Sequence, residues 1–283
     1  MTDPRYVYAV CSPLDTPLVA QPAGVAGVAP RPIHHAGLTA IVSDVPAGQF
    51  SESALRQSLE DLDWLAETAR AHQTVIAALT TVTSPLPLRL ATVFRDDSGV
   101  CTMLEEEGTR LRASLERIRD RVEWGVKVYV DDPPIETGGA GTHGGAALPG
   151  ERSRVAAEAL AAGAGRDYLR RRRAERAGRD DMWRRAETFA QRLHDQLGQH
   201  AQETRLHPPQ NPQLARTSGR NVLNAAYLVD GSKSESFMKS VEAGKDDRPG
   251  LRVELTGPWA AYSFSTPPEE RVHETQPVTG EAR

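Results

Sequence analysis

The stretch VEWGVKVYVD, residues 122–131, gives the clearest indication of the fold class. Within it, apolar side chains alternate with polar or small ones, and the apolar set is Trp124, Val126, Val128 and Val130. A period of two is typical of a β-strand with one buried face. We therefore predict a strand over 122–131 that packs one face against a core.

Upstream of this strand the sequence switches between strand-like and helix-like periods. Short apolar runs predict strands over 6–11 (YVYAVC), 38–42 (LTAIV) and 88–94 (LRLATVF). Apolar residues three and four apart predict two helices, one running from Ser51 to Leu79 and one starting at Asp96–Ser98 and reaching Val122. The Pro-rich residues 12–32 are interpreted as a surface loop. This order suits an α+β domain over 1–132, a ferredoxin-like variant with helices on one sheet face.

Residues 133–165 differ in composition from everything before them. They contain eight Gly and nine Ala among 33 residues and no aromatic side chain. Such a segment has little apolar area to bury and much chain entropy to lose. We interpret it as a flexible linker, with at most a short Ala-rich helix near 154–162.

A second α+β domain is predicted over 166–266. A long helix begins near Arg166 and ends before Pro208, and its apolar seam is Trp183, Ala186, Ala190, Leu193 and Leu197. Strands over 222–229 and 251–255, joined by a short helix ending at Gly244, form a βαβ unit whose strands are parallel or neighbouring. The polar tail 267–283 is expected to be disordered.

Composition excludes several classes of function. The net charge of -4 gives no strong field for nucleic acid or an anionic membrane. Two cysteines, Cys11 and Cys101, are too few for a disulfide framework, and no signal peptide or transmembrane run is visible, so we expect a cytoplasmic protein. The eight histidines lack metal-ligand spacing, and the Gly-rich 138–145 lacks the Lys-Ser/Thr of a P-loop. We therefore predict no catalytic residue, no cofactor and no metal.

The run Arg170, Arg171, Arg172 and Arg173 is the strongest candidate for a partner contact. Residues 166–206 contain 11 Arg and seven Asp or Glu, a local net charge of +4. Because acids follow at 175, 180 and 181, a solvated, salt-bridged helix is the favoured interpretation, and binding to an acidic partner or RNA is the alternative. Trp183 and Leu193 complete the candidate set, as part of the seam.

Five segments together resemble one family, and the resemblance covers nearly the whole chain in order. The segments are PLRLATVF (87–94), VEWGVKVY (122–129), YLRRRRAER (168–176), NAAYLV (224–229) and LTGPWAAYSF (255–264). They are similar to the gas vesicle protein L/F family (GvpL/GvpF). The resemblance implies two α+β domains, the first ferredoxin-like, and a cytoplasmic accessory protein without catalytic residues. Its implied partners are the hydrophobic, GvpA-like shell protein, bound on the gas-facing side, and other accessory proteins.

Two docking surfaces suit that role, namely the seam over 183–197 and a free sheet edge. An alternative is a small-molecule-binding regulator or enzyme on the ferredoxin-like sheet, which requires a pocket with convergent polar groups and shifted pKa values. An RNA-binding module built on the arginine-rich helix is a third hypothesis, and steep salt dependence of binding is its signature.

Overall fold

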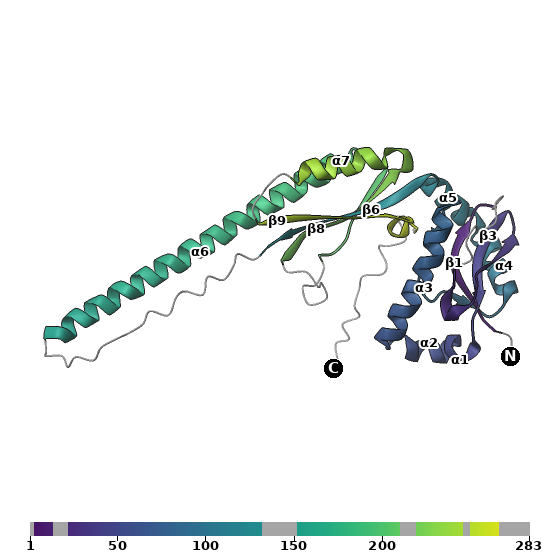
Figure 1. Ribbon diagram of the computed structural model, residues 1–283, viewed down its shortest axis with the longest axis horizontal. Helices are drawn as coiled ribbons and strands as arrows, with labels where there is room; N and C mark the ends of the chain where they lie inside the picture. The colour runs from purple at the N-terminus through teal and green to yellow at the C-terminus, as the bar shows by residue number, and fades with distance from the viewer. Residues whose placement is uncertain (1–2, 14–21, 132–151, 210–218, 246–249, 266–283) are drawn as a thin grey trace, which may run out of the picture.

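The computed structural model describes residues 3–13, 22–131, 152–209, 219–245 and 250–265. For residues 152–169, Arg171 and Glu175 it describes the helix backbone alone. Figure 1 shows a compact N-terminal half at one end, a second sheet in the middle, and one long helix that runs far beyond that sheet.

The N-terminal half is built on an antiparallel sheet with the strand order β2-β3-β1-β4, in which β5 also pairs with β1. Its strands are β1 (Arg5–Cys11), β2 (Arg31–His35), β3 (Leu38–Asp44), β4 (Leu86–Pro87) and β5 (Val93–Phe94). Its helices are α1 (Ala47–Phe50), α2 (Glu52–Ser58), α3 (Leu62–Thr80), α4 (Asp97–Glu106) and α5 (Gly108–Ile118), with a 3-10 turn, η1 (Val25–Gly27).

Both faces of this sheet are covered, whereas the sequence predicted helices on one face. Tyr6 and Tyr8 of β1 pack with Ile76 of α3 in one core cluster. Val7 and Val10 of the same strand pack with α4 and α5 in another. The first half therefore has three layers, because the alternating side chains of its central strand are apolar on both sides.

Three local predictions for this half were wrong in their boundaries. The helix expected over 51–79 is divided, because the Asp61 side chain accepts hydrogen bonds from the backbone N–H groups of Asp63 and Trp64 and starts α3 afresh. The helix expected to reach Val122 is likewise two helices, α4 and α5, which meet at Glu107. Of the strand expected over 88–94 only Val93–Phe94 (β5) is extended in the sheet; β4 lies just before the predicted range, and Ala91 between the two strands has a left-handed φ of 61°.

Residues 31–35 form the edge strand β2. The first two of them fall within the predicted surface loop over 12–32. Pro32 is tolerated in this strand, because β2 pairs with β3 alone.

The second sheet has the order β7-β8-β6-β9, and all neighbouring strands are antiparallel. Its strands are β6 (Arg121–Val130), β7 (Glu203–Leu206), β8 (Arg220–Asp230) and β9 (Leu251–Trp259). The predicted strand over 122–131 is thus confirmed as β6, but it lies between β8 and β9, so its assignment to the first sheet within 1–132 was wrong. The two sheets divide near residue 120. Strands β8 and β9 are parallel to each other but not neighbours, since β6 lies between them.

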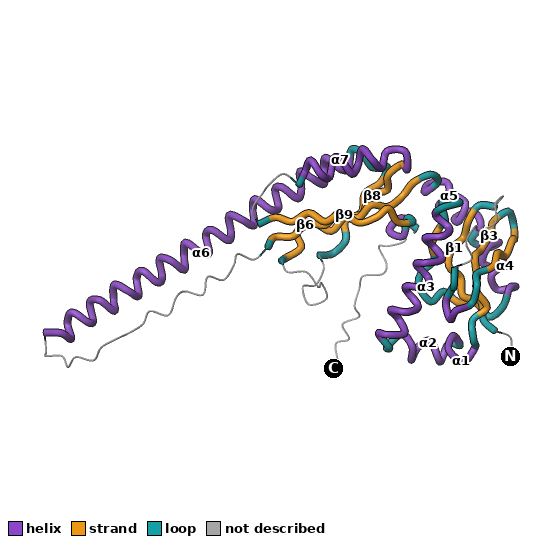
Figure 2. The backbone as a smooth tube through the Cα atoms, viewed as in Figure 1, coloured by secondary structure: helices purple, strands orange, loops and turns teal. Residues whose placement is uncertain are grey.

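One face of this sheet is covered by α6 (Arg152–Gly198) and α7 (Ser234–Gly244), as Figure 2 shows. Two further 3-10 turns are η2 (Gly231–Lys233) and η3 (Tyr262–Phe264). Helix α6 has 47 residues, which at 1.5 Å per residue is about 70 Å. It includes residues 152–165, so the predicted linker is helical there. The rest of that linker, and the tail predicted over 267–283, lie outside the described residues.

The cores of the two halves are continuous. The cluster of the first half that contains Val7 and Leu104 also contains Ala226 and Leu228 of β8 and Phe264 of η3. The second sheet thus uses one face for α6 and α7 and part of the other face to meet the first half.

Candidate protein-binding surface

A single seam runs along α6 and changes character where the second sheet ends. Its positions are spaced alternately four and three residues apart: Arg172, Arg176, Arg179, Trp183, Ala186, Ala190, Leu193 and Leu197. The last four are buried against the sheet, with Val126 and Tyr227 in the same cluster. The first three are exposed on the part of the helix that projects beyond the sheet. One helix face is therefore apolar where it packs on the sheet and cationic where the helix projects beyond the sheet.

The structure separates the predicted site residues into two groups. Arg170, Arg172 and Arg173 are exposed on the projecting helix, while the side chain of Arg171 lies outside the described residues. Leu193 is only 2% exposed, packed against Gly244, so it is not available to a partner and that part of the prediction was wrong.

Trp183 is half-buried and marks the boundary between the two groups. The guanidinium of Arg220 lies over its ring, 4.6 Å from the centroid. The seam over 183–197 is thus used internally.

We call residues 170–185 the arm. It contains eight Arg and three Asp or Glu, so its net charge is 8 − 3 = +5, whereas the whole chain carries -4 and the remainder therefore -9. Some of this charge is matched locally, because Asp181 pairs with Arg184 at 3.7 Å and with Arg185. The arm is the positive pole of an otherwise acidic molecule, and a field of this kind favours an anionic or acidic partner.

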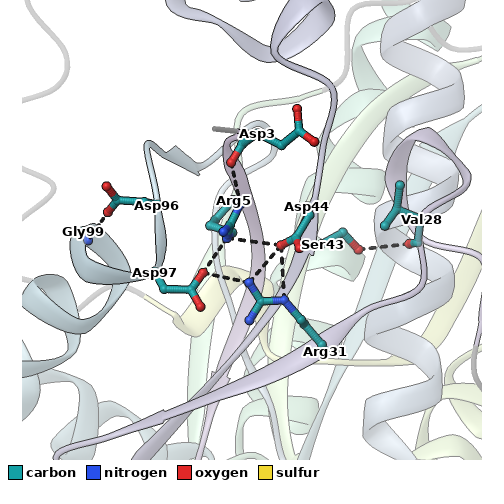
Figure 3. Close-up of polar contacts among 9 residues, drawn as sticks. All are labelled: Asp3, Arg5, Val28, Arg31, Ser43, Asp44, Asp96, Asp97 and Gly99. Atoms are coloured by element: carbon teal, nitrogen blue, oxygen red, sulfur yellow. Dashed lines mark hydrogen bonds and ion pairs between the residues drawn. The ribbon is translucent and has the colours of Figure 1, made fainter. Parts of the chain in front are cut away.

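Figure 3 shows a second cluster of charges, at the edge of the first sheet. Arg31 pairs with Asp44 at 2.9 Å and with Asp97 at 2.7 Å, and Arg5 pairs with the same two carboxylates. The hydrogen bond from Arg31, followed by that from Arg5, holds the pKa of Asp97 below its usual range. Two cations and two anions neutralise one another here and tie β1, β2 and β3 to the first turn of α4. This cluster fastens the fold.

The LTGPWAAYSF segment forms a clasp between the two halves. Ser263 donates from its backbone N–H and its hydroxyl to the Glu123 carboxylate, at 2.7 and 2.6 Å. Tyr262 donates to Gln73 of α3 at 3.0 Å, and Arg117 donates to the Phe264 carbonyl. Burial raises the pKa of Glu123 despite the two bonds from Ser263. The segment therefore joins α3, α5 and β6.

His72 of α3 is a buried histidine whose ring contacts the aromatic core of the first half. Its Nδ1 lies within hydrogen-bonding distance of the Tyr6 hydroxyl, at 2.9 Å, and that hydroxyl also accepts from the Ala91 N–H. Burial lowers the pKa of His72 to about 4. Nε2 is buried without a hydrogen-bond partner.

A hollow of about 680 Å³ lies between the halves, lined among others by Thr81, Ser84, Asp230 and Trp259. Two buried groups with shifted pKa values, His72 and Glu123, are not among its lining residues. In the part of the chain that is described, no group of three or more His, Cys, Asp or Glu could hold a metal ion. Nor does any helix among these residues have the length and apolarity to cross a membrane.

Comparison with known proteins identifies the family. The sequence model of the family described as "Gas vesicle synthesis protein GvpL/GvpF" matches residues 4–266. This chain belongs to the GvpL/GvpF family. It is 51% identical to gas vesicle protein L of Streptomyces sp. (strain CB03234) over 272 residues, 96% of each chain. It is 25% identical to gas vesicle protein F of the same strain, over 92% of this chain and 98% of the relative.

Solved structures share the fold of this GvpL/GvpF chain. Crystal structures of GvpF from Anabaena sp. PCC7120 and from Microcystis aeruginosa match with TM-scores of 0.63 and 0.60, at 19% and 20% identity. Each match covers 94% of this chain, and 97% and 100% of the respective structure. The predicted family and the mixed α+β architecture are thereby confirmed.

Sequence reasoning missed both the length of α6 and the clasp. The 4-3-4-3 spacing of the seam continues to Arg172, and following it past Trp183 would have predicted that the arm shares one face with the packed part of the helix. No comparable signal marks the clasp, because residues 259–264 carry neither a helical nor a strand period.

Proposed function

We propose that this chain acts in gas vesicle assembly by adhesion. It binds the hydrophobic, GvpA-like shell protein and other gas vesicle accessory proteins in the cytoplasm, and it contributes to the growing vesicle as a minor component on the gas-facing side. No covalent bond is made or broken in this role. The observation that carries the proposal is the match to the gas vesicle synthesis family over residues 4–266.

The physical need for such a protein follows from the shell itself. A subunit that is to face gas carries a large apolar surface, and exposing that surface to water costs about 25 cal/mol per Å². Free subunits would therefore aggregate through these surfaces. A protein that holds them transiently lowers their aggregation and directs where they assemble.

We place the partner contact on the arm rather than on the seam. The seam is occupied by the second sheet, whereas Arg170 and Arg173 are exposed on a helix that projects from the body. A projecting helix can lie along a partner without moving the rest of the fold, and its arginines offer both charge and long apolar stems.

Co-purification tests this proposal. The full chain and the shell protein are co-expressed, and the shell protein captured with the chain is measured for wild type, for Arg170→Glu/Arg173→Glu, and for the matched control Arg95→Glu/Arg119→Glu on the exposed surface of the first half. We expect capture by wild type and control and loss of capture by the arm variant.

Capture by all three would move the contact away from the arm while leaving the function in place. Absence of capture by wild type, together with normal vesicles in cells that lack the gene, would contradict the function itself.

A further inference from the structure

Strand β9 is the longest edge strand of the two sheets, and among the described strands it pairs with β6 alone. Its regular stretch lies between Gly250 and Gly257, whose φ angles are 86° and 125°. An edge strand presents a row of backbone N–H and C=O groups to any further strand, and proteins usually protect such edges. Edge strand β2 is protected by Pro32, whereas residues 251–255 contain neither proline nor glycine.

The side chains of 251–255 alternate between an apolar face and a charged one. Arg252 and Glu254 pair with each other on the charged face, away from α6 and α7. The partly buried side chains that pack against the core beneath these helices are Leu251, Val253 and Leu255. A further strand beside β9 would cover the exposed part of these apolar side chains.

The backbone groups that face the open edge belong to the apolar residues. The Asp131 N–H donates to the Gly250 carbonyl at 3.0 Å, so these two residues form a hydrogen-bonded pair of the ladder between β6 and β9. Hydrogen-bonded and non-hydrogen-bonded pairs alternate along an antiparallel ladder, and Arg252 and Glu254 fall in the bonded set. The N–H and C=O groups that point away from β6 are therefore those of Leu251, Val253 and Leu255.

The sequence LRVEL, residues 251–255, is complementary to itself. If two copies pair antiparallel about a two-fold axis at Val253, Leu251 lies opposite Leu255 and Arg252 lies opposite Glu254. The apolar pairs are then the hydrogen-bonded ones, and the charged pairs are the non-hydrogen-bonded ones, whose side chains are closer. An axis at Arg252 or at Glu254 would place two like charges opposite each other, which is destabilising.

This complementarity does not require a charge without a partner. Arg252 already pairs with Glu254 and with Asp131, the latter at 3.7 Å. A second copy would add one carboxylate beside each guanidinium and one guanidinium beside each carboxylate. The charges therefore select the register, while backbone hydrogen bonds and apolar area supply the affinity.

We propose that β9 of one copy pairs antiparallel with β9 of a second copy about a two-fold axis at Val253, joining two four-stranded sheets into one. A second copy is the occupant that these observations favour, because residues 251–255 themselves supply the opposite charges, the matching apolar face and the correct hydrogen-bonding groups. Such an interface uses the same surface on both copies, so association stops at the dimer. It goes beyond the proposed function, involves no residue of the arm and does not depend on shell binding.

Sedimentation velocity on the purified full chain, without any other protein, tests the proposal. We expect the weight-average mass of wild type to rise with concentration and to level off at twice the mass of one chain. Val253→Pro should stay monomeric, because proline removes an N–H that faces the edge and no hydrogen bond to β6. Circular dichroism of each variant checks that the fold is intact.

Two charge reversals test the register. Arg252→Glu and Glu254→Arg each place like charges opposite each other across the axis, so each variant alone should dimerise roughly tenfold more weakly than wild type. An equimolar mixture should recover the association, because a copy with two acids then meets a copy with two bases. The matched control is Lys239→Glu, which breaks an exposed ion pair with Glu235 on α7 and should dimerise as wild type does.

Several results would overturn the proposal. Monomeric wild type at every concentration would mean that the edge is open or is covered by another segment of its own chain, and a mass that rises beyond two chains would indicate another surface. A folded, dimeric Val253→Pro chain would exclude pairing through β9. So would a mixture that associates no better than either variant alone, and the mixture decides if Val253→Pro does not fold. Since no shell protein is present, the proposed function is judged separately, by co-purification.

Discussion

Two stretches of α6, residues 172–179 and 186–197, lie on one seam but have different surroundings. From Ala186 to Leu197 the seam is apolar and buried, and it holds the second sheet. From Arg172 to Arg179 the same spacing continues with arginine on an exposed arm. The spacing of residues determines which face of a helix is used. The chemistry of the side chains determines whether that face packs in the core or is exposed to solvent.

Truncating a side chain should affect the free energy of unfolding most differently between these two stretches. Leu193→Ala removes a side chain that is buried against Gly244 and should lower the free energy of unfolding by about 2–5 kcal/mol. Arg179→Ala, two heptads earlier on the same seam, should change it by less than about 0.5 kcal/mol. Urea denaturation followed by circular dichroism measures both. Equal losses would mean that the arm is packed like the seam.

Acid should destabilise the fold through His72, a buried basic group. His72 has an unfolded pKa of about 6.5 and a folded pKa of about 4, so between these values the unfolded chain binds more protons. Stability is fully present above pH 6.5 and falls as the pH is lowered to 4, by about 3 kcal/mol from this group.

His72→Gln should lose less stability than wild type over the same pH range, as measured by urea midpoints at several pH values. Parallel pH profiles for wild type and variant would show that His72 is not the titrating group.

Enlarging an alanine should lower stability on the seam but not on the arm. Ala186 is fully buried on the seam, so Ala186→Leu should cost about 1–3 kcal/mol through overpacking. Ala177 is exposed on the arm, and Ala177→Leu should change stability by less than about 0.5 kcal/mol. Thermal unfolding monitors the pair, and a stabilising Ala186→Leu would indicate an unfilled space beneath the helix.

The smallest effect is expected in the charge cluster of the first sheet. Asp97→Asn removes one of two carboxylates that face Arg5 and Arg31, but the group is half exposed. We expect a loss of about 0.5–1 kcal/mol at low salt, with a smaller loss at high salt. A salt-independent loss would point to packing rather than charge.

The sequence predicted the types of most elements, but not their partners. The alternation in 122–131 identifies a strand and its buried face, yet nothing in a period of two says which sheet the strand joins. Strand β6 pairs with β8 and β9, and its Trp124, Val126 and Val128 lie in one core cluster with residues of α6 and α7, which are far away in the chain.

Local chemistry explains the remaining differences. Gly163 and Gly165 favoured a linker, because each glycine costs about 1 kcal/mol in a helix, but the surrounding alanines and the long helix that follows favour continuation. The start of α3 is set by a single side chain, Asp61, which accepts hydrogen bonds from the backbone N–H groups of Asp63 and Trp64. Of the candidate contacts, Arg170, Arg172 and Arg173 are exposed as a partner surface requires, whereas Leu193 is buried.

If the arm binds partners and does not stabilise the fold, its arginines should be needed for buoyancy but not for folding. Recovery of buoyancy measures this directly. In cells whose own copy of the gene is deleted, flotation is measured after supplying wild type, the Arg95→Glu/Arg119→Glu control, or a chain with Arg170→Glu, Arg173→Glu and Arg176→Glu. We expect wild type and control to restore flotation, and the arm variant to accumulate as a folded protein without restoring it. Full flotation with the arm variant would contradict the account.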